Sequence, residues 1–340
     1  MSSSRFFRAA LVLLAAPLAH AATSVNSAPL GVIAADLTVG DNPVAFPLIE
    51  DDVFTATVTA NTAGALAFSS GNIGALLTAS RRYYAEIVTG PLEGERFDVN
   101  PAATIASADA TVTLDLGATS SSTRPTLAAN ALTTARIVIR PHVTLASLQA
   151  TFTPALTGNN NFNLADGVKI FNGSAFTFYY LRSDGLTWRI VGGTADFRSL
   201  VIPPDASILI ALKSGVRRWM QLGNVRTNAF RKNLVTGLQS FASGFPLDLS
   251  PVAIGASVSG AQPAGARWTG NDNATLADTL QIFSRPSFTE YSLRGDGAAW
   301  WQTGGSTDLS AVNFIGATAL TLLKRANANP DYVIARPFSL

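Results

Sequence analysis

Short runs in which apolar and polar residues alternate make up most of the region between residues 53 and 140. They cover residues 53–60, 64–70, 82–90, 95–99, 110–116 and 135–140. Alternation with a period of two predicts β-strands that bury one face. The connection from Pro91 to Gly94 contains a glycine and joins two such runs, so it predicts a hairpin. We therefore expect an N-terminal β domain over residues 30–145.

An internal repeat fills much of the second half of the chain. Residues 157–213 align without a gap with residues 269–325, at a constant offset of 112, and 20 of the 57 positions are identical. A self-match at one fixed offset indicates duplication of one folding unit. We expect two homologous β units in tandem, built on hairpins or meanders and barrel- or sandwich-like. The expected bounds are residues 146–215 and 257–326 for the units, 216–256 for the segment that connects them and 327–340 for a C-terminal tail.

The two copies share one strand face and differ in the other. In a strand, alternate residues share a face. The shared face carries Thr177, Tyr179 and Leu181, which recur as Thr289, Tyr291 and Leu293. We expect this face to form the common core. On the opposite face, Glu290 and Ser292 replace Phe178 and Tyr180. Copy two is expected to show that face to water, whereas in copy one we expect a neighbouring unit or a partner to cover the two aromatic residues.

Each copy contains an Asp-Gly dipeptide between two strand-like runs, Asp184-Gly185 and Asp296-Gly297. This dipeptide predicts a tight hairpin, in which both central residues have positive φ. A paired-carboxylate glycosidase site formed by Asp184 and Asp296 is the alternative. We favour the turn, because one active site does not need two copies of a hairpin tip.

Composition favours an all-β protein. Hydrophobic residues make up 47% of the chain and charged residues 14%, which excludes a disordered chain, and 27 Gly with 17 Pro favour short strands and turns. A length of 340 residues allows two or three domains. Cysteine is absent, which excludes disulfides, a thiol nucleophile and Cys-ligated metal.

The first 21 residues have the pattern of a cleavable signal peptide. Arg5 and Arg8 precede a short apolar run at residues 9–18, and Ala19-His20-Ala21 is a cleavage site of the A-x-A type. The apolar run is too short to span a bilayer, and no later run in the sequence is long and apolar enough. We therefore expect export to the periplasm, the cell surface or the extracellular space. Cleavage removes two of the 24 basic residues and leaves 22, equal to the 22 acidic residues, so we expect no nucleic-acid partner.

Candidate residues for catalysis or metal binding are few. After cleavage His142 is the only histidine, so a Ser-His-Asp triad could use only this residue, and we expect a structural or surface role for it. The Asn-rich loops at 158–161 and 270–273, followed by Asp166 and Asp278, place several oxygen ligands close together. We favour Asx turns over a calcium site, because each loop holds only one or two carboxylates and lacks the EF-hand spacing. No metal and no cofactor is predicted.

The candidate binding or interface residues are basic and aromatic. The connecting segment carries Arg217, Arg218, Arg226, Arg231 and Lys232 with no acidic residue between them. Such a run could meet anionic polysaccharide or lipid headgroups, and a solvated strand face is the alternative. Trp301 replaces Arg189 of the first copy and could stack on a sugar ring or be buried between the copies. Phe178 and Tyr180 complete the set of candidates.

Three blocks of the sequence carry a resemblance to a known family. They are YYAEIVTGPLEGERFDV, IVIRPHVTLASL and the repeated block with its IF, aromatic, Trp and Gly-Gly positions. In order and spacing they resemble a family of uncharacterised secreted proteins found in verrucomicrobial genomes. The resemblance covers most of the mature chain and implies export and a tandem architecture. It implies no activity and no catalytic residues.

The sequence thus predicts an exported, non-catalytic β protein of the cell envelope or extracellular matrix with a binding or scaffolding role. Polysaccharide or other envelope components are the expected partners. A secreted carbohydrate-active enzyme that uses Asp or Glu is the alternative, and it would need a deep cleft with two carboxylates about 5 to 10 Å apart. An outer-membrane β-barrel is the second alternative, but the frequent breaks and the C-terminal Pro-Phe-Ser-Leu fit it poorly.

Overall fold

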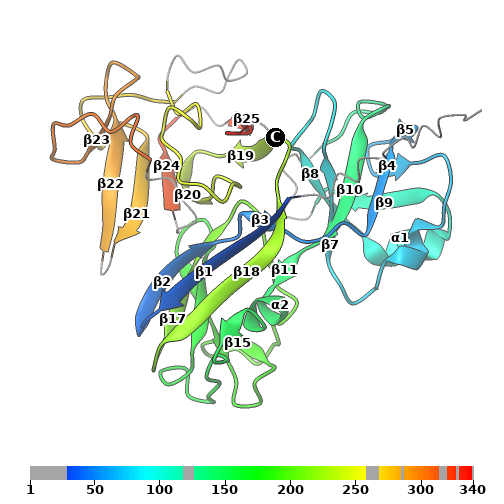
Figure 1. Cartoon of the computed structure of the whole chain (residues 1–340), viewed down its shortest axis with the longest axis horizontal. Helices are drawn as coiled ribbons and strands as arrows, with labels where there is room; N and C mark the ends of the chain where they lie inside the picture. The colour runs from blue at the N-terminus through cyan, green and yellow to red at the C-terminus, as the bar shows by residue number, and fades with distance from the viewer. Residues whose placement is uncertain are drawn as a thin grey trace, which may run out of the picture.

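A computed structural model describes residues 29–117, 126–257, 268–284, 287–313, 320–326 and 329–338. Strands account for 41% of the residues and helices for 6%, which confirms the predicted all-β class. Within the described ranges, no helix has both the length and the apolar composition needed to cross a membrane. The predicted signal peptide lies outside these ranges. Three β-rich parts are visible in Figure 1, and we name them the inserted sheet, the first sandwich and the second sandwich.

The inserted sheet lies on the right of Figure 1. Its strands are β4 (Phe54–Thr57), β5 (Ala60–Asn61), β6 (Ala65–Ala67), β7 (Tyr83–Ile87), β8 (Arg96–Val99), β9 (Thr111–Asp115) and β10 (Arg136–Pro141), in the order β4-β10-β7-β8-β9-β6-β5. The predicted hairpin is present, because β7 pairs antiparallel with β8. Gly94 has a φ of 86° in the connection, a conformation that favours glycine.

Two short helices pack beside the inserted sheet. The 3₁₀ helix η1 (Ile73–Leu76) contacts α1 (Pro101–Ser107), and both contact β9. Helix α1 begins where the Asn100 side chain accepts a hydrogen bond from the Ala103 N–H, with Pro101 at the first helical position, where its missing N–H costs nothing. Leu66, Ile87 and Phe97 are fully buried in the core of this part.

The first sandwich consists of two sheets around one core. The smaller sheet holds β1 (Leu30–Leu37), β3 (Leu48–Ile49), β12 (Phe152–Thr153) and β18 (Arg217–Val225); the larger holds β2 (Gly40–Ala45), β13 (Gly167–Phe171), β14 (Phe176–Leu181), β15 (Trp188–Ile190) and β17 (Ser207–Leu212), in the order β15-β14-β13-β17-β2. Helix α2 (Leu145–Gln149) and the short pair β11 (Val143–Thr144) and β16 (Val201–Ile202) lie beside them. Trp219 from the smaller sheet and Trp188 from the larger belong to the same buried cluster.

The second sandwich repeats this arrangement. Its smaller sheet pairs β19 (Phe230–Leu234) with β25 (Asn329–Ile334), and its larger sheet holds β20 (Gly237–Phe241), β21 (Thr279–Ser284), β22 (Ser287–Leu293), β23 (Trp300–Gln302) and β24 (Leu320–Lys324), in the order β20-β24-β21-β22-β23. Fully buried residues of the larger sheets occupy matching positions at the offset of 112, namely Val168 and Leu280, Leu181 and Leu293, Trp188 and Trp300, and Ile210 and Leu322. The strand order therefore follows the repeat in the sequence.

The pairing of residues 30–49 differs from the grouping expected from the sequence. Strands β1 and β2 pair with β18 and β17 of the first sandwich, not with the strands of the inserted sheet that follow them in the chain. Likewise, residues 329–334 of the expected tail form β25. In both sandwiches the first strand thus pairs with the last, and the inserted sheet occupies the interval between β3 and β11. Local alternation predicts a strand but carries no information about a partner so distant in sequence.

The Asp-Gly hairpins form, but with a different turn from the predicted one. Gly185 and Gly297 have φ values of 66° and 72°, whereas neither aspartate before them has a positive φ. The Gly185 N–H donates to the Arg182 carbonyl, and the Asp184 carboxylate accepts hydrogen bonds from the N–H groups of Leu186 and Thr187. The loop is therefore longer than a two-residue turn. Its extra residues bring the N–H groups of Leu186 and Thr187 within reach of the Asp184 carboxylate, which accepts hydrogen bonds from both.

The face on which the copies differ corrects one expectation and part of another. In the second copy Glu290 is exposed, as expected, whereas Ser292 on the same face is buried. In the first sandwich, Tyr180 is 6% exposed, and Phe162 from the same repeat unit lies over it at 6.3 Å between ring centroids. The cover therefore comes from the unit itself rather than from a neighbour. In the second sandwich, Ser292 is only 4% exposed because Trp301 lies opposite it on β23.

The two sandwiches contact each other through phenylalanines near the hairpin tips. Phe176 at the start of β14 stacks on Phe288 at the start of β22, with 6.5 Å between ring centroids and 17° between planes. Phe171 packs edge-on against Phe176, and Phe283 packs edge-on against Phe288. The repeated positions of the sequence thus meet as a nearly symmetric cluster.

Candidate functional site

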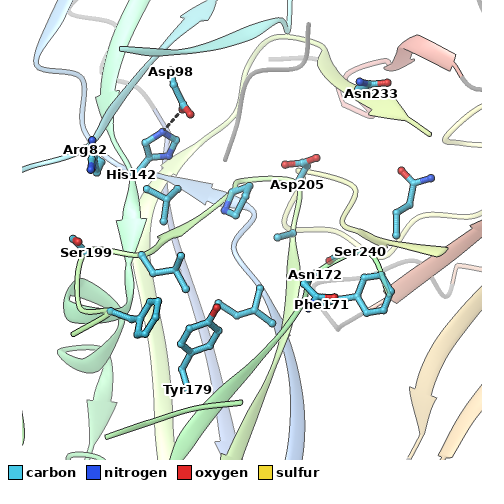
Figure 2. A pocket seen from close by; sticks show the side chains of 18 of the residues that line it. Arg82, Asp98, His142, Phe171, Asn172, Tyr179, Ser199, Asp205, Asn233 and Ser240 are labelled. Carbon is cyan, nitrogen blue, oxygen red and sulfur yellow. Dashed lines mark hydrogen bonds and ion pairs between the residues drawn. The ribbon is translucent and has the colours of Figure 1, made fainter. Parts of the chain in front are cut away.

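A cleft of about 920 Å³ opens where the inserted sheet and the two sandwiches meet (Figure 2). The inserted sheet contributes Asp98 and Asp115, and the chain just beyond it contributes His142. The first sandwich contributes an aromatic wall, and the second contributes polar residues of β19 and β20. Clefts between packed units are a common location for ligand sites. This cleft is therefore the candidate functional site.

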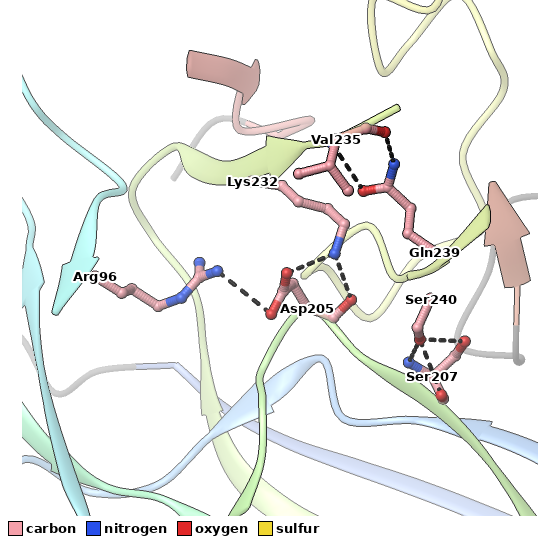
Figure 3. Close-up of polar contacts among 7 residues, drawn as sticks. All are labelled: Arg96, Asp205, Ser207, Lys232, Val235, Gln239 and Ser240. Carbon is pink, nitrogen blue, oxygen red and sulfur yellow. Dashed lines mark hydrogen bonds and ion pairs between the residues drawn. The ribbon is translucent and has the colours of Figure 1, made fainter. Parts of the chain in front are cut away.

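Asp205 connects all three parts at the cleft (Figure 3). Its carboxylate lies 2.5 Å from the Lys232 ammonium of β19 and 3.6 Å from the Arg96 guanidinium of β8. Burial alone would raise the pKa of Asp205, but these two cations outweigh it and hold the pKa below its ordinary value. Asp205 is therefore a carboxylate at neutral pH, and its charge is neutralised within the protein.

A histidine–carboxylate pair lies on the side of the inserted sheet. The ring nitrogen Nε2 of His142 lies 2.8 Å from Asp98 Oδ1, and both side chains are almost fully buried. Tyr84 packs on the imidazole at 4.8 Å between ring centroids. Figure 2 shows this pair at the upper left of the cleft. His142 therefore has the structural role expected from the sequence, and it orients a carboxylate at the cleft wall.

The aromatic wall presents groups that the protein itself does not use. Tyr179 packs edge-on against Phe197 at 5.3 Å, and Figure 2 shows its hydroxyl pointing into the cleft. Within the described residues, the Tyr179 hydroxyl and the Asn233 amide across the cleft form no hydrogen bond. Partial burial raises the pKa of Tyr179, so its hydroxyl stays protonated at neutral pH. Both groups can donate and accept hydrogen bonds to a ligand.

The basic residues of the connecting segment do not form one exposed surface. Arg217 is 8% exposed and lies 3.5 Å from Asp166, whereas Arg218 is exposed and lies 3.6 Å from Asp36. They alternate in β18, so they point to opposite faces.

The remaining basic residues are used inside the molecule. Arg226 is buried against Glu86 and lies over the Phe230 ring. Arg231 donates to the carbonyl oxygens of Glu93 and Pro91, and Lys232 binds Asp205. This segment joins the second sandwich to the inserted sheet, which accounts for its run of cations without neighbouring acids.

The aromatic candidates lie away from the cleft. Trp301 is half-buried, with the Arg294 guanidinium 4.1 Å above its ring. Phe178 is half-buried between Gly167, which leaves room for its ring, and the Lys213 ammonium at 5.3 Å. Together with Tyr180, Trp301 and Phe178 cover the faces of the larger sheets that point away from the cores of the two sandwiches.

The acidic residues of the repeated loops are used by the backbone. Asp166 accepts hydrogen bonds from the N–H groups of Thr157 and Lys213, and Asp278 accepts them from Thr269 and Arg325. Each carboxylate thus ties the loop to the end of a strand. Among the described residues, no group of three or more His, Asp or Glu side chains is placed to hold a metal ion.

The sequence did not indicate the residues of the cleft as a set. Asp98, Tyr179, Asp205 and Asn233 come from four strands or loops that are far apart in the chain. Two lining residues were singled out, His142 as the only histidine of the mature sequence and Lys232 as part of the basic connecting segment. Tyr179 was predicted as a core residue, and it does pack against the core while its hydroxyl reaches the cleft.

Comparisons with known proteins give no match. No protein-family model, no curated protein and no solved structure resembles the chain.

Proposed function

We propose that the protein is an exported, non-catalytic binding protein of the cell envelope or extracellular matrix, and that it holds a neutral, hydroxyl-rich glycan in the cleft. The observation that carries the proposal is the pair of unused polar groups, the Tyr179 hydroxyl and the Asn233 amide, which face the same cleft from the two sandwiches. Sugar hydroxyls need partners that both donate and accept, and these two groups do both.

The aromatic side chains support a sugar ligand. Phe171, Tyr179 and Phe197 line one wall of the cleft and are each half-buried, so part of each ring remains open. The apolar faces of sugar rings pack on such surfaces, while the hydroxyl groups at their edges need hydrogen-bond partners. A wall of open rings opposite polar side chains meets both requirements.

The charges of the cleft support a neutral ligand. Asp205 is neutralised by Lys232 and Arg96, and Asp98 is paired with His142. Asp196 at the rim binds Arg198. Because each of these carboxylates already has a partner within the protein, a cationic ligand would have to displace that partner. A neutral glycan requires no such exchange.

A hydrolytic enzyme is the second candidate, and one observation favours it. Asp98 and Asp115 lie directly opposite each other on β8 and β9, and both line the cleft. A glycosidase also needs one carboxyl with a raised pKa as general acid. Asp196 and Asp205 have lowered pKa values, because hydrogen bonds and neighbouring cations outweigh their burial. Asp98 is already bonded to His142. Binding without hydrolysis is the better account.

Affinity electrophoresis of the purified protein tests this proposal. The gels contain dextran, laminarin or galactomannan as neutral probes, and heparin as an anionic one. We expect retardation by at least one neutral probe, and we expect Tyr179→Phe and Asn233→Ala each to weaken it about tenfold, as for the loss of one good hydrogen bond. Tyr291→Phe is the matched control, since this residue is the repeat equivalent of Tyr179 and does not line the cleft.

Two results would contradict the proposal. One is retardation by heparin alone; the other is equal weakening by the control variant. Release of reducing ends from a retarding probe would support the hydrolytic candidate instead, and Asp98→Asn and Asp115→Asn should then abolish that release.

A further inference from the structure

Strand β1 is the longest edge strand in the described part of the chain. It pairs with β18 over all eight of its residues, and no other described strand pairs with it. Its opposite edge is therefore open. Figure 1 shows β1 and β18 running across the front of the larger sheet of the first sandwich. Open edges of this length present backbone groups that can pair with another strand.

The register identifies the backbone groups on this edge. The Val225 N–H donates to the Pro29 carbonyl at 2.8 Å, so the bonded rungs between β1 and β18 fall on the odd-numbered residues of β1. The N–H and C=O groups of Leu30, Val32, Ala34 and Asp36 point away from β18. They make four regularly spaced positions along the open edge.

The outward face next to this edge is apolar. Leu30 and Val32 are 78% and 65% exposed, and Leu222 and Met220 on β18 are 61% and 42% exposed. Val32 lies directly opposite Leu222. The pair of Asp36 and Arg218 closes the apolar row at one end only. Natural edge strands usually carry charges that prevent pairing, and the centre of β1 carries none.

The equivalent edge of the second sandwich is covered within the chain. Its first strand, β19, pairs with the last strand as β1 does. The connection between β7 and β8 lies against β19, where Arg231 donates to the Glu93 and Pro91 carbonyls and the Ala229 N–H donates to the Glu93 carboxylate. The chain itself thus covers the edge of β19, whereas no described residue covers the edge of β1.

We propose that β1 pairs antiparallel with β1 of a second copy, so that the smaller sheets of two first sandwiches join into one sheet. The symmetric register that uses all four open positions places Val32 opposite Ala34 of the second copy, and Leu30 opposite Asp36. The two Asp36 carboxylates then lie at opposite ends of the paired strands, about 20 Å apart, so no like charges meet. The edge is therefore self-complementary, as a two-fold interface requires.

Sedimentation of the purified protein over a range of concentrations tests the pairing. We expect a monomer–dimer equilibrium, and we expect Val32→Lys to raise the dissociation constant about tenfold or more, because a charge on the edge opposes strand pairing. Met220→Lys is the matched control, since this residue lies on the same exposed face but one strand inward. It should change the constant by less than about threefold. A monomer at all concentrations would overturn the proposal.

Engineered cysteines test the register. Because the native sequence has no cysteine, any disulfide that forms must involve the introduced residues. The double variant Val32→Cys with Ala34→Cys places a thiol opposite a thiol across the proposed axis, at a separation that allows a disulfide. We expect an oxidised, covalent dimer that reducing agent releases. Leu222→Cys should not cross-link. A dimer that resists cross-linking at the edge and is weakened equally by Met220→Lys would indicate face-to-face packing and reject this pairing.

Discussion

Ser292 lies directly opposite Trp301 across strands β22 and β23. At the same place in the first sandwich, Tyr180 lies opposite Arg189. The large aromatic side chain has therefore changed strands between the two copies, from the inner strand to the edge strand. This one position of the face is buried in both, since Ser292 is 4% and Tyr180 is 6% exposed.

This relationship predicts a compensating pair of substitutions. Ser292→Tyr alone should lower the free energy of unfolding by about 1 to 3 kcal/mol, because the new ring overlaps the space that the indole fills. Adding Trp301→Arg, which reproduces the first sandwich, should recover at least half of that loss. Urea unfolding of the two single variants and the double variant measures the coupling. Additive losses would mean that the two side chains do not share one space.

The repeated turns predict the cost of removing a glycine. Gly185→Val and Gly297→Val should each lower the free energy of unfolding by about 1 kcal/mol or more, because both positions have a positive φ that a β-branched residue avoids. Leu186→Val is the control, since this exposed residue lies in the same loop and is not among those with a positive φ. Equal melting temperatures for all three variants would show that the turn conformation carries no strain.

Local features of the fold could be predicted from the sequence, and long-range ones could not. The alternating runs gave the strands of the inserted sheet, and the repeat gave the matching cores with Trp188 and Trp300. The partners of β1 and β2 lie more than 160 residues away, and alternation says nothing about such a distance. The ion pairs could not be predicted from the sequence either. Asp205 lies in the first repeat unit and Lys232 in the connecting segment, and only the packing of the two sandwiches brings them together.

The candidate site was missed for the same reason. The cleft exists only where three units meet, and each of its residues has an ordinary local context. A strand such as β14 reads as a core strand whether or not the hydroxyl of Tyr179 extends past the core. The basic segment was open to two interpretations because its acidic partners Glu86 and Asp205 come from other units. Their pairing follows from the arrangement of the units and not from any motif.

The ion pairs of Asp205 should make the stability of the protein depend on pH. Its folded pKa lies below the ordinary value of 3.8, so its ion pairs stabilise the fold above about pH 4 and are lost as the pH falls through the folded pKa. Asp205→Asn should lower the melting temperature at pH 7 and reduce the loss of stability between about pH 5 and pH 2. Asp36→Asn is the control, because Asp36 and its partner Arg218 are both exposed and such surface pairs contribute about 1 kcal/mol or less. If both variants kept the wild-type pH profile, Asp205 would not join the three parts.

Chelation should leave stability unchanged. Asp166 and Asp278 are fully buried, and both oxygens of each accept hydrogen bonds from the backbone or from a cation. They therefore have no free capacity for calcium, which needs six to eight oxygen ligands. We expect melting temperatures to agree with EDTA and with added calcium. A rise of several degrees with calcium would show that the loops bind the ion after all.

We expect a larger loss of stability when the buried aspartate of the second copy, Asp278, is replaced. In the second sandwich, Asp278 lies 2.6 Å from the Lys324 ammonium, and both side chains are at most 1% exposed. Asp278→Asn should lower the free energy of unfolding by about 3 to 5 kcal/mol, because it removes the negative charge that lies beside a buried cation. The double variant with Lys324→Met should recover part of this loss, since Leu212 occupies the equivalent position in the first sandwich and is buried there. The exposed pair of Asp36 and Arg218 is the control, and Asp36→Asn should cost about 1 kcal/mol or less. A double variant no more stable than Asp278→Asn alone would show that the lost backbone hydrogen bonds, and not the loss of the negative charge beside Lys324, account for the cost.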